Sequence, residues 1–416
     1  MPQQESEVLL FTGAAQVATC TGPPRATEGA DPAGVLEGAA VAVEGKRIAA
    51  LGPAAELRAR YPGAAEVECR GGVLTPGLVD SHTHAVFGRW RADEYVLRSQ
   101  GVPYMEIARR GGGIHASVRD LRARSEDELV ELSLPRLREM LLQGTTTAEV
   151  KSGYALRTED ELKMLRAIRR LGELQPITLV PTFLGAHELP EEYRERRGAY
   201  LELLTEEMIP AVAAGGLARF CDVFMEPGVF TREESERILR AGLEHGLRPK
   251  LHADELEGSG GAELAAEVGA ASADHLGDIS EAGIRALAAS ATVATLLPAT
   301  LFFLGKKRYA PARALLDAGA TVALATDFNP GSSPTSSLSF VLSAACSQMG
   351  MAPAEALRAA TAGGAAALEL EDGTGTLRPG APADLALWRA GAVEEIPYRL
   401  AAPLCTAVWK GGAQVV

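Results

Sequence analysis

The segment Pro76-Gly-Leu-Val-Asp-Ser-His-Thr-His84 joins a short apolar run to a pair of histidines. Residues 77–80 have the pattern of a buried strand. Side chains on an extended chain alternate between its two faces, so His82 and His84 are expected to point to the same side. Two imidazoles placed in this way can bind one metal ion. Alone, the pair is weak evidence, because such histidines also occur as solvated loop residues.

Seven further short β-type runs follow, and longer segments rich in Ala, Leu, Arg and Glu separate them. This alternation is typical of repeated βα units around a parallel sheet, and eight strands close a (β/α)8 barrel. Catalytic groups in such barrels gather at the carboxyl ends of the strands. The eight predicted strands are residues 77–80, 145–150, 177–180, 221–225, 249–252, 271–275, 292–297 and 322–327.

The two chain ends have a different style, with short β runs broken by turn residues, and Glu44-Gly45-Lys46 predicts a hairpin turn. The 416 residues also exceed the ~250 of a bare barrel, so an added module is expected. The sequence therefore predicts an α/β fold with a TIM-like barrel at residues 73–370. Residues 1–72 and 371–416 are predicted to build one small β-sandwich domain together.

Composition excludes several classes of partner. A formal charge of −13 without a basic stripe argues against nucleic acid and anionic membranes. Five scattered cysteines, an odd number without a C-x-x-C pair, indicate a reduced, cytoplasmic compartment. The N-terminus, with Glu5 and Glu7, lacks the pattern of a signal peptide. Residues 291–305 are too short an apolar stretch for a membrane span, and we interpret them as a buried strand and its loop.

Five of the seven histidines fall at or just after predicted strands: His82, His84, His187, His252 and His275. The fifth strand ends in His252-Ala-Asp-Glu255, and the eighth ends at Asp327, so a third imidazole and a carboxylate should meet the His82/His84 pair. Three nitrogens, one oxygen and an open position for water describe a catalytic metal site better than a structural one.

Each of these residues also has a plain structural interpretation. Asp327 suits the cap of the turn that follows it, and His252 suits a hydrogen-bonded core histidine. Taken together, such interpretations do not explain why the residues converge.

These motifs carry a family resemblance. The His82/His84 segment is similar to the metal-binding opening of the amidohydrolase superfamily. The other motifs resemble the hydrolases in it that open 4-imidazolone-5-propanoate, and the match runs from about Val73 to Leu368. The further matching segments are Glu149–Tyr154, Thr182–His187, His252–Glu255, Ser272–Leu276 and Ala325–Pro334.

The resemblance implies hydrolysis of that ring to N-formimidoyl-L-glutamate, a step of histidine degradation, by a cytoplasmic homodimer. It implies one divalent ion, Zn²⁺ or Fe, which lowers the pKa of a water and polarises the ring carbonyl. The implied ligands are His82, His84, His252 and Asp327. Glu255, His275 and Asp327 are all candidates for proton transfer, and the sequence does not apportion the roles.

Substrate contacts are implied in the same way. Arg91 matches the arginine that binds the propanoate, a task that suits a guanidinium because it forms two parallel hydrogen bonds with a carboxylate. Nearby Arg89 is the competing candidate. The remaining implied substrate-binding residues are Tyr154, His187, Glu255, Asn329, Gly331 and Ser332.

Departures and alternatives remain. Ala155 and Ala299 stand where the family commonly has glycine, and alanine disfavours a positive φ, so the sequence leaves open whether the loop near Tyr154 keeps the family's geometry. The fourth strand ends at Met225-Glu226 without a lysine to bridge two metals, so a mononuclear site is expected. Glu226 could bridge a second ion, but a hydrogen-bonding role is the simpler expectation. An aminohydrolase of a purine or pyrimidine base would share the metal apparatus, and a metal-free scaffold protein is the alternative outside enzymes.

Overall fold

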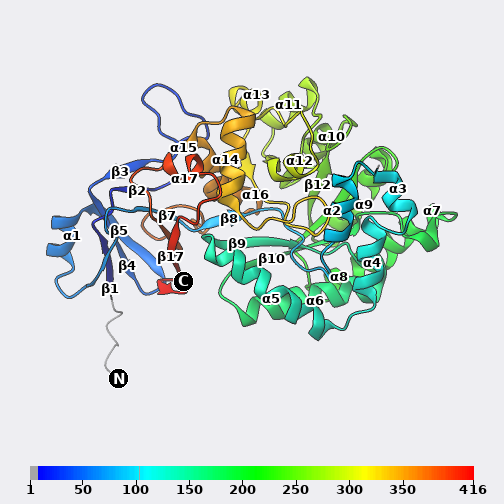
Figure 1. The fold of residues 1–416 in the computed structure, drawn as a ribbon, viewed down its shortest axis with the longest axis horizontal. Coiled ribbons are helices and arrows are strands. Elements are labelled where there is room, and N and C mark those ends of the chain that lie inside the picture. The colour runs from blue at the N-terminus through cyan, green and yellow to red at the C-terminus, as the bar shows by residue number, and fades with distance from the viewer. Residues whose placement is uncertain (1–7, 103) are drawn as a thin grey trace.

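The computed structural model describes residues 8–102 and 104–416 (Figure 1). Residues 1–7 of the predicted sandwich part, with Glu5 and Glu7, lie outside the described residues. An eight-stranded parallel sheet forms the centre of the molecule, and its strands are hydrogen-bonded in chain order. The predicted α/β barrel is confirmed.

Every predicted barrel strand overlaps one observed strand, because apolar and β-branched residues fill these short runs and bury them on both faces. The strands are β8 (Leu78–Asp80), β9 (Thr145–Lys151), β10 (Thr178–Ala186), β11 (Phe220–Met225), β12 (Arg248–Ala253), β13 (Ser272–His275), β14 (Val293–Leu296) and β15 (Val322–Leu324).

The barrel closes between β8 and β15 just beyond the ends of these strands. Thr83 and Phe328 form a parallel bridge there. The N–H of Asp327 donates to the carbonyl of His82 at 3.0 Å, and the N–H of His84 donates to that of Phe328 at 2.9 Å. The seam of the barrel therefore brings the first histidine pair beside Asp327.

The last strand is shorter than predicted, since β15 ends at Leu324. Thr326 leaves the ladder because its N–H and hydroxyl donate to the buried carboxylate of Asp80 at 3.0 and 2.6 Å. Asp327 then adopts a left-handed φ of +54°. Such a conformation costs a non-glycine residue about 1–3 kcal/mol and occurs mostly at functional sites.

Helices cover the outside of the barrel (Figure 1). Two of them begin with a capping box, in which Ser125 and Thr231 are the N-caps. The longer barrel helices are α5 (Glu126–Leu142), α6 (Thr158–Leu174), α9 (Arg232–Glu244) and α14 (Leu338–Met349); shorter ones include α2 (Ala92–Ser99), α4 (Ile114–Arg122), α10 (Gly261–Glu267), α11 (Glu281–Ala288) and α13 (Ala312–Ala318).

Residues 291–305 contain the predicted buried strand, β14. The prediction that a loop follows this strand is wrong. Helix α12 (Pro298–Phe303) occupies that place, and Pro298 lies at its first position, where a missing N–H costs nothing. No helix among residues 8–102 and 104–416 is long and apolar enough to cross a membrane.

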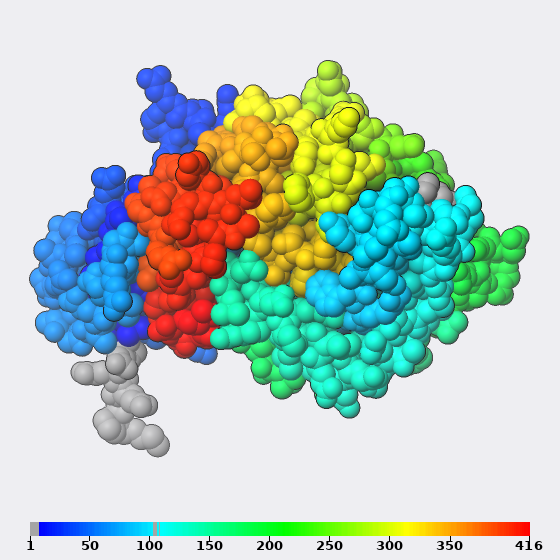
Figure 2. Space-filling model, viewed as in Figure 1, coloured from blue at the N-terminus to red at the C-terminus, as the bar shows by residue number. Residues whose placement is uncertain are grey.

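Both chain ends build the remaining sheets, and the predicted hairpin at Gly45 is confirmed. Phe11 and Trp409 meet edge to face at 4.9 Å, one from each sheet, and Figure 2 shows the two ends side by side. The domain boundaries after residues 72 and 370 stay predictions. One sheet orders β5 (Arg47–Pro53), β4 (Ala39–Glu44), β1 (Val8–Thr12) and β6 (Ala65–Glu68); the other orders β18 (Ala413–Gln414), β17 (Cys405–Lys410), β16 (Leu385–Trp388), β7 (Val73–Pro76), β2 (Gln16–Ala18) and β3 (Val35–Glu37).

Candidate metal centre and substrate cavity

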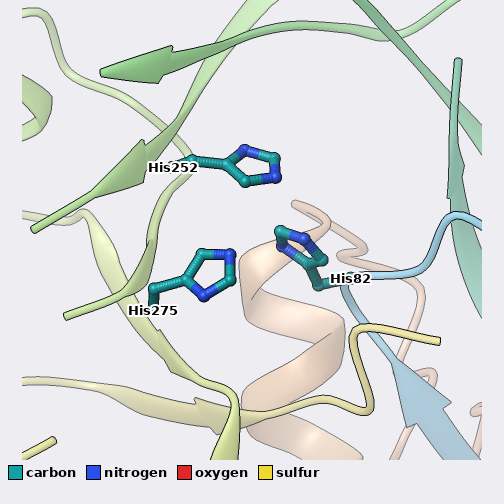
Figure 3. Close-up of side chains that lie close together, drawn as sticks. All are labelled: His82, His252 and His275. Atoms are coloured by element: carbon teal, nitrogen blue, oxygen red, sulfur yellow. The ribbon is translucent and has the colours of Figure 1, made fainter. Parts of the chain in front are cut away.

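Three imidazoles from distant parts of the chain face one another inside the barrel (Figure 3). His82 follows β8, His252 lies on β12 and His275 ends β13. The ring centroids of His82 and His252 are 4.6 Å apart, and those of His252 and His275 are 5.2 Å apart. The carboxyl ends of parallel strands meet at one end of the barrel, which explains why these rings converge.

His84 and Asp327 complete the group. The Nε2 atoms of His82 and His84 lie 3.5 and 3.6 Å from Oδ1 of Asp327. The ring of His84 lies 5.3 Å from that of His82 and 5.7 Å from that of His252. The structure thus brings together all four residues predicted as ligands, His82, His84, His252 and Asp327, and adds His275 beside them.

The donor atoms of this group suit a cation. Within the described chain, His82 Nε2, His84 Nδ1 and both ring nitrogens of His252 are buried without a hydrogen-bond partner. A buried polar atom without a partner is costly, and a metal ion would remove that cost. Burial holds the pKa values of His82 and His84 well below their usual range, and the positive charges of neighbouring groups add to this. Both rings are therefore neutral, the form that coordinates metals.

Glu255 and His275 lie next to this group, with His275 Nε2 3.6 Å from Oε2 of Glu255. Burial, together with the negative charges of Asp327 and Glu226, raises the pKa of Glu255 to about 8. Burial likewise raises the pKa of Asp327 to about 6, although the hydroxyl of Thr300, which donates to Asp327 Oδ2 at 2.6 Å, lowers it. Both carboxyls can therefore exchange protons near neutral pH.

Glu226 fixes the loop that carries Glu255. Its carboxylate accepts the N–H groups of Glu255, Leu256 and Glu257 at 3.2, 3.3 and 2.8 Å. The expected hydrogen-bonding role of Glu226 is confirmed.

A cavity of about 470 Å³ opens beside the histidines. Its volume suits a small ligand. Glu255, His275, Asp327, His84 and His252 line one side of it. Every residue predicted to bind substrate also lines it: Arg91, Tyr154, His187, Glu255, Asn329, Gly331 and Ser332.

Arg91 is held at the cavity wall by a two-point contact with Glu94, in which its Nε and Nη2 donate at 3.0 and 2.7 Å. Its Nη1 faces Gly331, where a side chain would collide with it at 2.4 Å. Arg89, in contrast, is exposed, pairs with Asp93 at 3.2 Å and does not line the cavity. The geometry favours Arg91 over Arg89 as the cation for an anionic ligand.

Two aromatic side chains, His187 and Tyr154, line the cavity beside His84. The ring of His187 stacks on that of His84, with centroids 5.0 Å apart and planes at 16°. The Nδ1 of His187 lies 3.0 Å from the carbonyl of Gly153. The ring of Tyr154 lies beside both imidazoles, with its centroid 5.6 Å from that of His84 and 5.4 Å from that of His187.

Asn329 shapes the loop after Asp327. Its Oδ1 accepts the N–H groups of Gly331 and Ser332 at 2.8 and 2.7 Å, and its Nδ2 donates to the carbonyl of Asp327 at 2.6 Å. The loop is therefore rigid and holds its polar groups toward the cavity.

The backbone accommodates both alanines that stand where the family commonly has glycine. Neither Ala155 nor Ala299 has a positive φ, so alanine fits both positions without strain. Ala299 instead lies in the first turn of α12. Leu156, with φ +55°, is a left-handed non-glycine residue near Tyr154, and Gly153 also has a positive φ.

Sequence reasoning missed several groups at the site. Arg98, Glu94 and Lys306 line the cavity, and Arg98 Nη2 donates to the carbonyl of Gly331 at 3.3 Å. It also missed five charged, fully buried residues on the barrel strands beside the histidines. A charged residue within an apolar strand is unusual, and this could have marked them in the sequence. These are Glu149, Lys151, Asp222, Lys250 and Asp274.

Comparison with known proteins adds the family. Residues 73–413 match the model of the Amidohydrolase family, and residues 39–64 match an imidazolonepropionase-like composite domain of bacteria. The imidazolonepropionase of Symbiobacterium thermophilum is 48% identical over 98% of this chain and 97% of its own length. That of Myxococcus xanthus is 48% identical over 97% of this chain and 96% of its own.

Solved structures agree on the fold. A zinc-bound adenosine deaminase from Xanthomonas campestris superposes with a TM-score of 0.72 at 21% identity, covering 98% of this chain and 92% of its own. The ochratoxinase of A. niger gives 0.71 at 20% identity, covering 99% and 96%. At this identity the likeness extends to the fold alone. The sequence relatives carry the stronger conclusion: the chain belongs to the Amidohydrolase family and, within it, to the imidazolonepropionases.

Proposed function

We propose that this protein hydrolyses 4-imidazolone-5-propanoate to N-formimidoyl-L-glutamate in histidine degradation. The observation that carries the proposal is a single cavity that holds both a metal-type donor set and a fixed arginine. A hydrolytic centre suits the cyclic amide, and the arginine suits the propanoate, so one small molecule can use both.

We propose His82, His84, His252 and Asp327 as the ligands of one Zn²⁺ or Fe ion, which fits the unpartnered ring nitrogens there. When bound, such an ion lowers the pKa of water toward neutrality and polarises a carbonyl. The absence of a lysine at the end of β11 favours a mononuclear site.

The chain's own residues then supply proton transfer and orientation. Glu255, with a pKa of about 8, holds a proton at neutral pH and is suited to give it to the ring nitrogen that leaves. Asp327, with a pKa of about 6, is suited to take one from the attacking water. His275, 3.6 Å from Glu255, is the third candidate and is suited to orient that carboxyl.

Substrate orientation follows from the cavity wall. We propose that Arg91 binds the propanoate, while Tyr154 and His187 hold the ring against His84. Asn329, Gly331 and Ser332 would then bind the polar groups of the product through their rigid loop. Binding the charged end of the substrate at Arg91 would fix which ring bond meets the attacking water.

Two further proposals concern the protein's setting. We propose that it works as a homodimer in the cytoplasm. The five cysteines, all within the described chain, are free thiols, which is consistent with a reducing compartment.

A coupled assay tests the function. Urocanase supplies the unstable imidazolone substrate, and its ultraviolet absorbance is followed with and without this protein, with His252→Ala as the control. Decay faster than the spontaneous rate, lost in the variant, supports the proposal. Decay at the spontaneous rate, or release of ammonia from a purine or pyrimidine base instead, would contradict it.

A further inference from the structure

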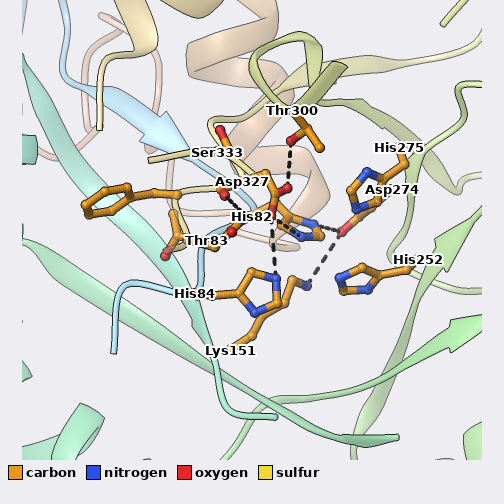
Figure 4. Close-up of polar contacts among 12 residues, drawn as sticks. His82, Thr83, His84, Lys151, His252, Asp274, His275, Thr300, Asp327 and Ser333 are labelled. Carbon is orange, nitrogen blue, oxygen red and sulfur yellow. Dashed lines mark hydrogen bonds and ion pairs between the residues drawn. The ribbon is translucent and has the colours of Figure 1, made fainter. Parts of the chain in front are cut away.

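The imidazole of His82 has different environments at its two nitrogens (Figure 4). Nδ1 lies 2.6 Å from Oδ2 of Asp274, in a hydrogen bond that is fully buried. Nε2 has no hydrogen-bond partner within the described chain and lies 3.5 Å from Oδ1 of Asp327. A neutral imidazole protonated at the nitrogen that faces a carboxylate keeps its lone pair on the other nitrogen.

Asp274 is itself held from several sides. Its Oδ1 accepts the hydroxyl of Ser272, two residues earlier on β13. Its Oδ2 lies 3.6 Å from Nζ of Lys151 and 3.8 Å from Nζ of Lys250. Neither Asp274 nor either lysine is exposed at all. Such paired charges and hydrogen bonds offset the cost of removing a carboxylate from water.

The same lysines also bind two other carboxylates. Lys151 Nζ lies 2.7 Å from Asp222 and 2.8 Å from Glu149, and Lys250 Nζ lies 3.0 Å from Glu149. Burial alone would lower the pKa of Lys151, but Asp222 and Glu149 raise it above its usual range, so the ammonium is charged. Three acidic side chains thus pack against two lysines in one buried cluster beside the histidines.

We propose that Asp274 is a positioning residue of the metal centre. By accepting Nδ1–H of His82, it fixes the ring orientation and the tautomer that presents Nε2 to the cation. Asp274 does not line the cavity, so its effect on substrate passes through His82. This inference rests on the metal site in the proposed function.

A second carboxylate occupies a similar place behind another ring. Asp222 Oδ2 lies 3.0 Å from Nδ1 of His252, although the angle falls outside hydrogen-bond geometry. The contact at His82 meets that geometry and is therefore the one to test.

Asp274→Asn keeps the shape of the side chain but offers His82 an amide that can donate to Nδ1, which would favour the wrong tautomer. The matched control is Glu149→Gln, which removes a carboxylate from the same two lysines but no hydrogen-bond or ion-pair partner of an imidazole among the described residues. Zn²⁺ affinity of the metal-stripped proteins is measured by competition with a chromophoric chelator. The visible spectrum of the Co²⁺-loaded proteins reports the ligand geometry.

Asp274→Asn is expected to weaken Zn²⁺ binding about 10- to 100-fold and to change the Co²⁺ spectrum, with KM little changed. Glu149→Gln is expected to stay within about threefold of the wild type. Should Asp274→Asn not fold, Ser272→Ala keeps every charge and is expected to weaken binding by a smaller factor, because the carboxylate loses one restraint.

Unchanged affinity and spectrum in Asp274→Asn, or in Ser272→Ala where that variant takes its place, would overturn the inference. An equal loss in Glu149→Gln would also overturn it, because the cause would then be charge balance. A wild-type chain that binds no metal would overturn the metal site as well. A wild-type chain that binds one metal but leaves the imidazolone intact would reject only the proposed substrate.

Discussion

Thr300→Val is a small change with a measurable effect on the candidate metal centre. The hydroxyl of Thr300, at the first turn of α12, donates to Asp327 Oδ2 at 2.6 Å, and both groups are buried. Valine keeps the volume of threonine but cannot donate. The variant therefore leaves one carboxylate oxygen of Asp327 without this donor.

The free energy of unfolding that Thr300→Val loses depends on whether Asp327 is charged. A hydrogen bond to an ionised group contributes about 1.5–3 kcal/mol to stability, and one between neutral groups about 0.5–1.5 kcal/mol. Burial raises the pKa of Asp327 from 3.8 to about 6. The variant should therefore lose about 1 kcal/mol more at about pH 7.5, where Asp327 is charged, than at about pH 5, where it is mostly neutral.

The shift in the pKa of Asp327 on folding predicts the same direction of pH dependence for the stability lost in Thr300→Val. The folded chain keeps the proton of Asp327 to a higher pH than the unfolded chain does. The stability from this group is therefore fully present below about pH 3.8 and is lost as the pH rises toward 6. The Thr300 hydroxyl lowers the pKa of folded Asp327, so its removal is expected to raise that pKa further and to extend the loss of stability above pH 6.

Urea unfolding of the metal-stripped protein at both pH values measures this difference, because added metal would mask the titration of Asp327. Thr295→Val is the matched control. It makes the same substitution on the neighbouring strand β14, where the buried hydroxyl has no hydrogen-bond partner within the described chain. Thr295→Val is expected to change stability little at either pH. Equal penalties for Thr300→Val at the two pH values would refute the reasoning.

Three other perturbations have defined outcomes. Arg91→Met should raise KM about 10- to 100-fold in steady-state kinetics, with kcat less affected, because a charge-assisted pair with the propanoate is lost. Arg89→Met should leave KM and kcat unchanged, and similar effects of the two variants would reject Arg91 as the residue that binds the propanoate. Glu255→Gln should lower kcat about 10²- to 10⁴-fold in the coupled assay, and full activity would exclude Glu255 from proton transfer. In the metal-stripped protein, the variant should also lack the loss of stability that Glu255 is expected to cause as the pH rises from about 4.5 to 8. Chelation should abolish activity and lower Tm, and Zn²⁺ or Fe²⁺ should restore both; activity in a stripped protein shown by elemental analysis to lack metal would contradict a metal-dependent mechanism.

Local sequence patterns could predict most of the barrel. The eight strands are short runs of apolar and β-branched residues between helical segments, so their number and order follow from periodicity. His82, His84 and His252 could be placed for the same reason, since catalytic groups gather at the carboxyl ends of barrel strands. The hairpin at Gly45 follows from turn chemistry alone.

Features that depend on distant contacts could not be predicted. β15 ends early because Thr326 bonds to Asp80, which is far away in the sequence. Helix α12 occupies the place of an expected loop, and one face of it is buried in the core. The sequence of residues 298–303 alone does not predict that packing. The roles of Asp274 and Lys151 likewise depend on side chains from four different strands, and only their unusual charge within apolar runs was visible.

The most direct test is a crystal structure of the purified protein with anomalous diffraction recorded at the zinc and iron edges. We expect one peak per chain, about 2.0–2.2 Å from a ring nitrogen of His82, His84 and His252 and from a carboxylate oxygen of Asp327. Two peaks, a peak held by other residues, or none in a catalytically active crystal would contradict a single ion bound by three imidazoles and one aspartate.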